Sequence, residues 1–430
     1  MSGLNAFVLI VLIFASPALC FAQDAPVVWI KTFTGGDEIV DLSVDLAGNI
    51  YVTGTTKKSP PDYLTLKYNT NGKKLWKKSY GIAGKEDVPS ALKVDNKGNV
   101  YVTGKSHGGA SAYDFLTLKY TPTGELKWSA RLNNTENHTD YALNLAVDRF
   151  ENVYVTGGSR SSKTGYDIVV VKYGSAGNRE WISVFTGPGF IPPWIDDFGR
   201  YIQVDEAGNV YVAGTIEKSH TDIFVMKLNR DGLLLWSQIY DGPSHFHDDP
   251  SGLALDSEGN IFVAGNISSV SNQNIILIKY SNSGVRQWVK SYSKPSAAYD
   301  FFLDNSGNVY IAGSAKVSGS SNFITMKFAS NGAKKWYRFF NDGGPFAWAK
   351  SIDVDDAGNV YVTGNVMTKT YSDNVITLKY NSLGKRVWMA RHSGHTDNAR
   401  AVAVDSLGGV IVATDDSRGD WTIIKYAQEP

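Results

Sequence analysis

The chain repeats one sequence unit eight times, and this repetition constrains its fold more than any other feature. Each unit contains a D-x-x-G-N string followed by β-branched and aromatic residues, and the string returns every 48 to 57 residues. Its first residue, called the anchor here, is Asp45, Asp95, Asp148, Asp205, Asp256, Asp304, Asp355 or Asp405. Glu151 replaces the glycine in the third unit, and the eighth unit is degraded to DSLGGVIVAT. Such a period indicates supersecondary units that bury their faces against one another.

Two further markers follow each anchor in a fixed order, a lysine within [DN]-x-x-x-x-K and then a tryptophan after a glycine turn. The lysines are Lys67, Lys119, Lys172, Lys227, Lys279, Lys327, Lys379 and Lys425. The tryptophans are Trp76, Trp128, Trp181, Trp236, Trp288, Trp336 and Trp388. The eighth tryptophan segment stands at the other end of the chain, around Trp29. We therefore predict that the N-terminal segment pairs with the C-terminal unit and closes a ring.

Each unit is predicted to form four short strands separated by glycine turns. Residues 99–104 are rich in β-branched and aromatic side chains on both faces, which is typical of a sheet covered on both sides. Helical periodicity is absent over any useful length. The fold class expected for residues 23–430 is therefore all-β, a single eight-bladed β-propeller of four-stranded blades.

The unit resembles the bacterial β-propeller repeat family SBBP. Units of that family carry a G-x-D segment, then V-D-x-x-G-N-V-Y-V-T-G, a K-[YF] strand and a G-x-x-x-W strand, and these markers recur here in the same order. The resemblance covers essentially all of residues 23–430. It implies an exported propeller, usually without an assigned activity, although the family is named for seven blades and this chain has eight units.

Residues 1–22 have the layout of a signal peptide. An apolar run at 6–15 is followed by a Ser-Pro breaker and by small residues before a cleavage position after Ala22. A lipid anchor on Cys20 is the alternative. We expect a secreted, periplasmic or cell-surface protein whose mature part, residues 23–430, contains no cysteine.

Charge and motifs exclude several classes of function. Lysine plus arginine and aspartate plus glutamate both number 42, so a nucleic-acid partner is not expected. The mature chain has no apolar run long enough to span a membrane. No G-x-S-x-G, H-E-x-x-H or phosphate-binding loop is present, and we expect no cofactor.

Residues that recur in every unit are interpreted as scaffold. The tryptophans are predicted to pack between blades, and each lysine to pair with the anchor aspartate of its own unit. A second acidic position lies eight residues before the anchor, at Asp37, Asp87, Asp140, Asp197, Asp248 and Asp397, with Ser296 and Ala347 in the remaining units. These carboxylates are predicted to circle one mouth of the central channel. They either accept hydrogen bonds from loop amides or form a funnel that attracts cations.

The loops that differ between units are the better guide to function. The segments from the tryptophan strand to the next unit share one face and are rich in aromatic and histidine residues. The candidate ligand-binding residues there are Trp194, His245, Phe246, His247, Asp248, Phe346, Trp348, His392 and His395. The His245-x-His247 pair is also a candidate metal site, because alternate residues of an extended segment point the same way.

These features favour an exported, non-catalytic and monomeric propeller that presents a variable, aromatic-rich loop face to a glycan or a surface protein. Two alternatives remain open. One is a hydrolase or lyase, with or without a metal, that uses His245, His247 and Asp248. The other is a purely structural module of an envelope.

Overall fold

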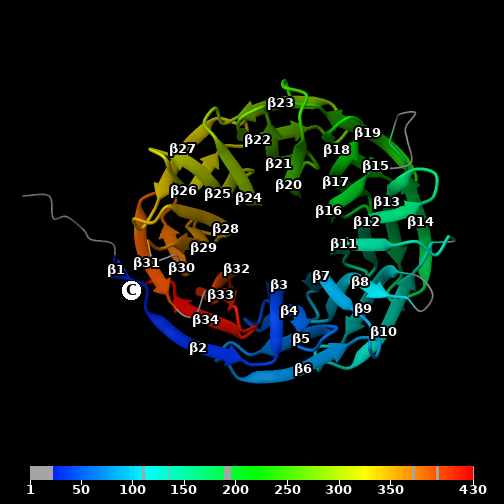
Figure 1. Ribbon diagram of the computed structural model, residues 1–430, viewed down its shortest axis with the longest axis horizontal. Helices are drawn as coiled ribbons and strands as arrows, with labels where there is room; N and C mark the ends of the chain where they lie inside the picture. The colour runs from blue at the N-terminus through cyan, green and yellow to red at the C-terminus, as the bar shows by residue number, and fades with distance from the viewer. Residues whose placement is uncertain are drawn as a thin grey trace, which may run out of the picture.

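The computed structural model describes residues 23–108, 112–134, 136–187, 195–369, 373–393 and 397–429. All regular structure among these residues is β-sheet, and no helix occurs among them. Figure 1 shows the strands arranged as a ring of sheets that radiate from one central axis. Among the described residues no helix is present that could cross a bilayer. The predicted signal peptide at 1–22 lies outside the described residues.

The ring consists of eight sheets, numbered here as blades 1 to 8 in chain order. Blade 1 is β3 (Gly36–Val44), β4 (Ile50–Thr56), β5 (Tyr63–Tyr68) and β6 (Lys74–Tyr80). Blade 2 is β7 (Asp87–Val94), β8 (Val100–His107), β9 (Tyr113–Tyr120) and β10 (Leu126–Leu132). Blade 3 is β11 (Asp140–Val147), β12 (Val153–Ser161), β13 (Gly165–Tyr173) and β14 (Arg179–Phe185), with β15 (Ile195–Asp196) added to β13. Blade 4 is β16 (Phe198–Val204), β17 (Val210–Glu217), β18 (Thr221–Leu228) and β19 (Leu234–Tyr240).

The second half of the ring repeats this plan. Blade 5 is β20 (Asp248–Leu255), β21 (Ile261–Ser268), β22 (Gln273–Tyr280) and β23 (Arg286–Ser291). Blade 6 is β24 (Ser296–Leu303), β25 (Val309–Val317), β26 (Ser320–Phe328) and β27 (Lys334–Phe340). Blade 7 is β28 (Phe346–Val354), β29 (Val360–Met367), β30 (Asp373–Tyr380) and β31 (Arg386–His392). Blade 8 is β32 (Asn398–Val404), β33 (Gly409–Asp415), β34 (Trp421–Ala427) and, from the other end of the chain, β2 (Val27–Phe33).

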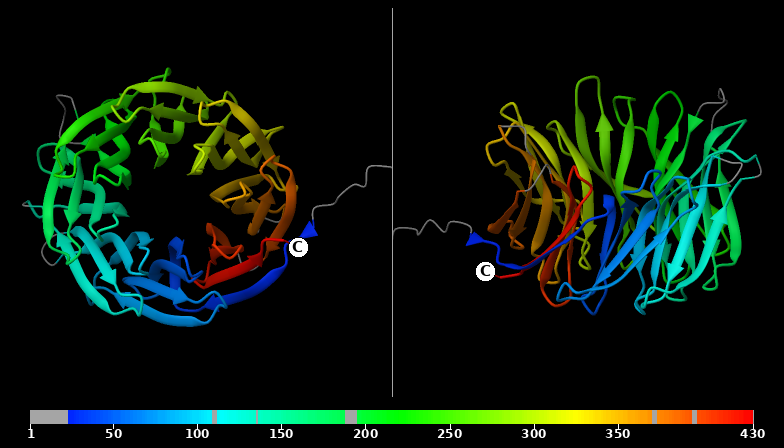
Figure 2. Two further views of the ribbon diagram at one scale, coloured as in Figure 1. Left: turned by 180° about the vertical axis from the view of Figure 1, so that it is seen from behind. Right: turned by 60° about the horizontal axis from the view of Figure 1, so that its bottom comes forward.

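The two ends of the chain close the ring, as the sequence predicts. Strand β2 pairs antiparallel with β34, and Trp29 lies opposite Lys425. A short parallel pairing of β1 (Gln23–Asp24) with β31 extends the closure onto blade 7. Figure 2 shows the N-terminal segment running beside the C-terminal strand on the outside of the ring. Closure by shared hydrogen bonds removes the exposed edges that an open stack would leave.

The hydrophobic core is divided into eight clusters, and each lies between two neighbouring blades. The cluster between blades 1 and 2, for example, joins Tyr51 and Tyr63 to Val100 and Leu118. The central strands of each blade are therefore covered on both faces, which explains why their sequences are apolar without alternation.

The recurring tryptophans pack between blades, as predicted. The Trp76 indole N–H donates to the Pro122 carbonyl of the next blade at 3.0 Å. Equivalent bonds to the next blade come from Trp29, Trp128, Trp181, Trp236, Trp336 and Trp388. Gly124, with φ +81°, lies directly against the Trp76 ring, where a Cβ would meet ring carbons at 2.9 Å. Each of these seven tryptophans thus links its blade to a turn of the next blade.

Strand direction defines two faces of the ring. The D-x-x-G-N turns and the turns between third and fourth strands form the bottom face. The loops between second and third strands, and the segments that lead from one blade into the next, form the top face. Recurring turn sequences therefore occupy the bottom, and the variable loops occupy the top.

Candidate functional site

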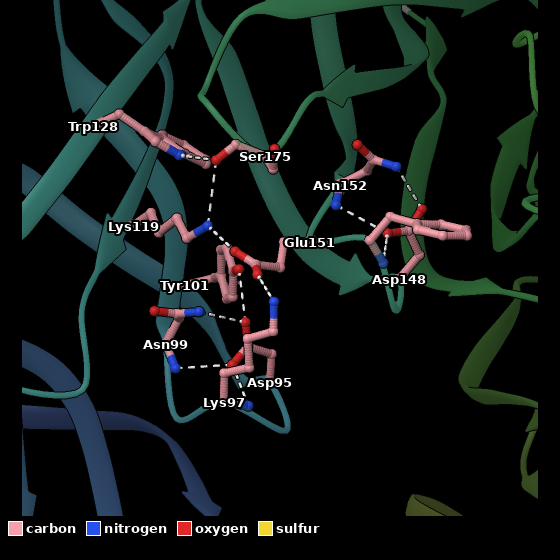
Figure 3. Close-up of polar contacts among 11 residues, drawn as sticks. Asp95, Lys97, Asn99, Tyr101, Lys119, Trp128, Asp148, Glu151, Asn152 and Ser175 are labelled. Carbon is pink, nitrogen blue, oxygen red and sulfur yellow. Dashed lines mark hydrogen bonds and ion pairs between the residues drawn. The ribbon is translucent and has the colours of Figure 1, made fainter.

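The anchor aspartates hold the bottom turns together. The Asp95 carboxylate accepts hydrogen bonds from the backbone N–H groups of Lys97 and Asn99, from the Asn99 side-chain amide and from the Tyr101 hydroxyl, at 2.8–2.9 Å (Figure 3). The same tyrosine hydroxyl bond, at 2.9–3.1 Å, occurs in six blades. This network recurs because every blade needs the turn, so it is scaffold rather than a site.

The prediction that each lysine pairs with its anchor aspartate is wrong for most blades. Among the described residues such ion pairs join only Lys279 to Asp256, at 3.3 Å, and Lys425 to Asp405, at 2.6 Å. In those two blades the tyrosine is replaced by Phe262 or Ile411. The other six lysines have their ammonium groups over the tyrosine ring, 4.8–5.6 Å from its centroid. In these six blades the tyrosine hydroxyl therefore donates to the anchor carboxylate oxygen with which the lysine would otherwise form an ion pair.

Blade 3 departs from this pattern at the bottom face. Glu151 stands where the other turns have glycine and adopts φ 66°. Its carboxylate bonds to Lys97 at 2.5 Å and to the buried Lys119 at 2.6 Å, as Figure 3 shows. A neighbouring cavity of about 430 Å³ is lined by these turns and by Lys93 and Arg149. Acidic and basic groups are balanced there, so the cavity has no preference for one sign of charge.

The predicted acidic ring lies where the strand count placed it, at the top of the inner strands. The Asp87, Asp140, Asp197 and Asp248 side chains are, however, buried. They accept hydrogen bonds from loop backbone N–H groups at 2.5–3.0 Å. Burial raises the pKa of Asp197 and of Asp248 to about 6. Asp397 is also buried and Asp37 is exposed.

The carboxylates of Asp87, Asp140, Asp197 and Asp248 therefore hold the entry loops in place and, being buried, are not presented to the central axis as a funnel for cations. Of the two interpretations given for these aspartates in the sequence analysis, their contacts agree with the one in which they accept hydrogen bonds from loop amides. The physical reason is that an extended entry loop carries unpaired N–H groups, and a buried carboxylate satisfies them.

The candidate ligand-binding residues from the variable segments are distributed around the top face. Phe246 and Phe346 are exposed by 39% and 50%, while Trp348 on β28 is partly exposed. His392 at the end of β31 lies 3.6 Å from the Asp397 carboxylate. Trp194 and His395 lie outside the described residues. The described members fall into two groups, residues 245–248 at the entry to blade 5 and Phe346, Trp348 and His392 in blade 7, and do not form one cluster.

The two imidazoles of the His245-x-His247 pair contact different partners in the structure. His245 Nδ1 lies 2.7 Å from the Asp241 carboxylate, whereas His247 Nδ1 accepts a hydrogen bond from the Thr221 N–H at 3.2 Å. The Asp248 carboxylate accepts a hydrogen bond from the Gly242 backbone N–H. Among the described residues, the one group with metal-ligand geometry is instead His220, Asp222 and Asp241.

A row of aromatic side chains crosses the top face of blades 2 to 4, and sequence reasoning missed it. The rings follow one another with centroids 4.9–6.1 Å apart, in the order His107, Tyr113, Tyr141, Tyr166 and Phe198. Each ring is partly exposed. Tyr141 and Tyr166 are stacked, with their planes 20° apart. We call these five residues the aromatic row.

The row forms because strand starts and strand ends meet at the top of adjacent blades. Tyr113 on β9 reaches Tyr141 of the next blade, and Tyr166 on β13 reaches Phe198 of the blade after that. The position six residues before the repeat lysine is tyrosine in these two units. In the other six units that position is Pro61, Thr221, Gln273, Ser321, Asp373 or Gly419. A comparison of the eight units at this one position would have pointed to Tyr113 and Tyr166 as residues that the scaffold does not require.

Polar groups flank the aromatic row. The Lys105 ammonium lies 4.4 Å from the centroid of the Tyr113 ring and 2.7 Å from the Glu86 carboxylate. The Arg200 guanidinium lies 5.8 Å from the centroid of the Phe198 ring. The row therefore presents ring faces and edges between hydrogen-bonding side chains.

The ring of eight four-stranded blades makes the protein an eight-bladed β-propeller. Residues 75–109 and 246–270 match the family described as SBBP, beta-propeller repeat. These two matches confirm the resemblance of the repeat unit to that family.

An alignment 193 residues long, which covers 35% of this chain and 13% of the other protein, is 24% identical to an uncharacterized WD repeat-containing protein of Acanthamoeba polyphaga mimivirus. Among solved structures, Sqt1 from Chaetomium thermophilum is similar with a TM-score of 0.58 and 9% identity, over 93% of this chain and 98% of that one. An ulvan lyase, a polysaccharide lyase, gives a TM-score of 0.49 and 11% identity, over 84% of this chain and 96% of that one. At these identities the likeness concerns the fold alone.

Proposed function

We propose that the protein is an exported, non-catalytic propeller that binds a carbohydrate chain on the top face of blades 2 to 4. The aromatic row is the observation that supports this proposal. Pyranose rings have apolar C–H faces that pack against aromatic rings, and their hydroxyl groups hydrogen-bond to polar side chains at the edges of such a surface. The row offers both kinds of contact.

The length of the row favours an extended ligand. It runs across the junctions of blades 2 and 3 and of blades 3 and 4, with rings contributed by β8, β9, β11, β13 and β16. A single small molecule would cover only part of such a surface, whereas consecutive sugar residues could each contact a ring. Because the side chains stand on strand ends, little ordering accompanies binding.

The bottom face is less suited to a specific ligand. Two of its cavities, of about 430 and 610 Å³, are lined by anchor aspartates and by neighbouring residues of the turns and strand ends. Residues required by every blade do not distinguish one part of the ring from another. The non-recurring residues of the top face do.

Binding to a glycan array tests the proposal with a matched control. The double variant Tyr141→Ala/Tyr166→Ala removes the centre of the row, and we expect its affinity for any glycan bound by the wild type to fall about tenfold or more. Phe150→Ala removes a ring that is 61% exposed on the bottom face of the same blade, and should bind like the wild type. Equal binding by all three proteins would refute the assignment of the site.

Export is a separate part of the proposal and has its own test. If residues 1–22 act as a signal peptide, the protein recovered from outside the cytoplasm should begin at Gln23. An N-terminus at Met1 on that protein would contradict the proposal.

A further inference from the structure

The top face between blades 4 and 5 carries a group of potential metal ligands that is separate from the aromatic row. It consists of the Nε2 atom of His220, in the loop between β17 and β18, and carboxylate oxygens of Asp222 on β18 and of Asp241 just after β19. These three atoms lie within 4.8 Å of one another. His220 Nε2 is 3.2 Å from an Asp222 oxygen and 3.4 Å from an Asp241 oxygen.

Asp222 provides the second observation that points to a ligand. Its side chain is only 1% exposed, and neither of its carboxylate oxygens accepts a hydrogen bond. The Lys218 ammonium, whose side chain is 44% exposed, forms an ion pair with one of these oxygens at 3.7 Å, which is longer than a hydrogen bond. A buried carboxylate without hydrogen bonds is costly unless another charge compensates it.

The groups around the three ligands are arranged as a supporting shell. The second ring nitrogen of His220, Nδ1, lies 2.8 Å from the Ser219 hydroxyl. The second oxygen of Asp241 lies 2.7 Å from Nδ1 of His245. Metal-binding histidines and carboxylates are commonly oriented by such outer contacts, which fix the ring and aim the free atom inward.

The combination occurs once in the repeat. The Asp222 position is aspartate in several units, but the His220 position is Pro60, Ala112, Gly165, Asn272, Ser320, Ser372 or Arg418 elsewhere. The Asp241 position is Thr34, Gly81, Asn133, Thr186, Ser293, Asn341 or Ser393. The ring does not need this set in order to fold, which distinguishes it from the recurring scaffold residues.

We propose that His220, Asp222 and Asp241 bind a divalent transition-metal ion of the Zn²⁺ type. One imidazole nitrogen and two carboxylate oxygens are a donor set that Zn²⁺ accepts, with water completing a tetrahedron. Ca²⁺ requires six or more oxygen ligands, which three side chains including an imidazole do not supply. The ion compensates the buried Asp222 charge and joins β18 of blade 4 to the segment that leads into blade 5.

The proposal is tested by titrating the chelator-treated full chain with Zn²⁺ in a calorimeter and by repeating thermal unfolding with and without the ion. We expect the wild type to bind one ion per chain and to unfold at a higher temperature in its presence. His220→Ala and Asp222→Asn should lose both effects. His138→Ala, which alters another top-face histidine beside a single carboxylate, Glu136, should keep both.

Asp241→Asn provides the readout if Asp222→Asn does not fold, because Asp241 is partly exposed and its replacement leaves the buried position intact. A wild type that shows neither binding nor stabilisation would overturn the proposal, and His220 would then be an ion-pair partner of the two aspartates. Zn²⁺ binding retained by both His220→Ala and Asp241→Asn would also overturn it, because the ion would then be bound elsewhere.

Discussion

Replacement of an anchor carboxylate should destabilise the ring far more than replacement of the tyrosine that binds it. Asp45 accepts hydrogen bonds from the N–H groups of Ala47 and Asn49, from the Asn49 side chain and from the Tyr51 hydroxyl, at 2.8–3.0 Å. Asp45→Ala leaves all four donors without their acceptor. At about 1 kcal/mol for each of the two turn N–H groups and for the Asn49 amide, and somewhat more for the buried hydroxyl, we expect the free energy of unfolding to fall by about 4 kcal/mol.

Tyr51→Phe should cost only about 1 kcal/mol, because the chain already contains the arrangement that would replace the lost bond. Phe262 occupies the tyrosine position in blade 5, and there Lys279 lies 3.3 Å from Asp256. Lys67, now over the Tyr51 ring, is in the same position to move to Asp45.

Urea unfolding followed by tryptophan fluorescence measures both losses. Asp256→Ala is the matched control, since it removes the same turn bonds together with a lysine ion pair and should cost about as much as Asp45→Ala. The reverse change, Phe262→Tyr, should raise stability slightly by adding the hydroxyl bond. If Tyr51→Phe proved as destabilising as Asp45→Ala, the explanation of the lysine positions would be wrong.

Three further predictions concern packing, charge and closure. Gly124→Ala should lower the free energy of unfolding by about 3 kcal/mol and Gly84→Ala by about 1 kcal/mol, because both glycines have positive φ but only Gly124 contacts the Trp76 ring. Thermal unfolding of the two variants measures both losses. Equal losses would contradict the packing argument. Burial raises the pKa of Asp197 from 3.8 to about 6. Between pH 3.8 and about 6 the folded chain therefore holds a proton on Asp197 that the unfolded chain has lost. The free energy of unfolding should fall by up to about 3 kcal/mol as the pH rises through this range. Denaturation midpoints across that range should fall less steeply in Asp197→Asn, and an unchanged slope would count against the shift. Trp29→Ala weakens the closing strand and should make the N-terminal segment more sensitive to limited proteolysis than the wild type, whereas unchanged cleavage would argue against its role in closure.

The ring and its closure could be predicted because they depend on residues that recur. The anchor turns, the tryptophans and the displaced segment around Trp29 specify the blades, their number and the pairing of the chain ends. The lysine pairing was predicted wrongly because two donors compete for one carboxylate oxygen. Sequence spacing alone does not show that the Tyr101 hydroxyl reaches Asp95 before Lys119 does.

The aromatic row and the metal-ligand group could not be predicted in the same way. Tyr113 and Tyr141 belong to different units and meet only where two blades adjoin. His220 lies in a loop between second and third strands, whereas the sequence directed attention to the segments between blades, which hold His245 and His247. Contacts between different units depend on how the blades are placed around the ring; a comparison of units shows which positions diverge, but not which of the divergent side chains meet.

The central claim, that carbohydrate binds along the aromatic row, is tested most directly by mapping the footprint of a glycan selected from the array. Hydrogen–deuterium exchange of the free and bound protein would locate it. We predict that the bound glycan slows exchange at residues 105–108, 112–114, 139–142, 165–168 and 197–200. Exchange at the bottom turns, such as 148–152, should not change. Protection confined to the bottom face, or to blades outside 2 to 4, would contradict the account.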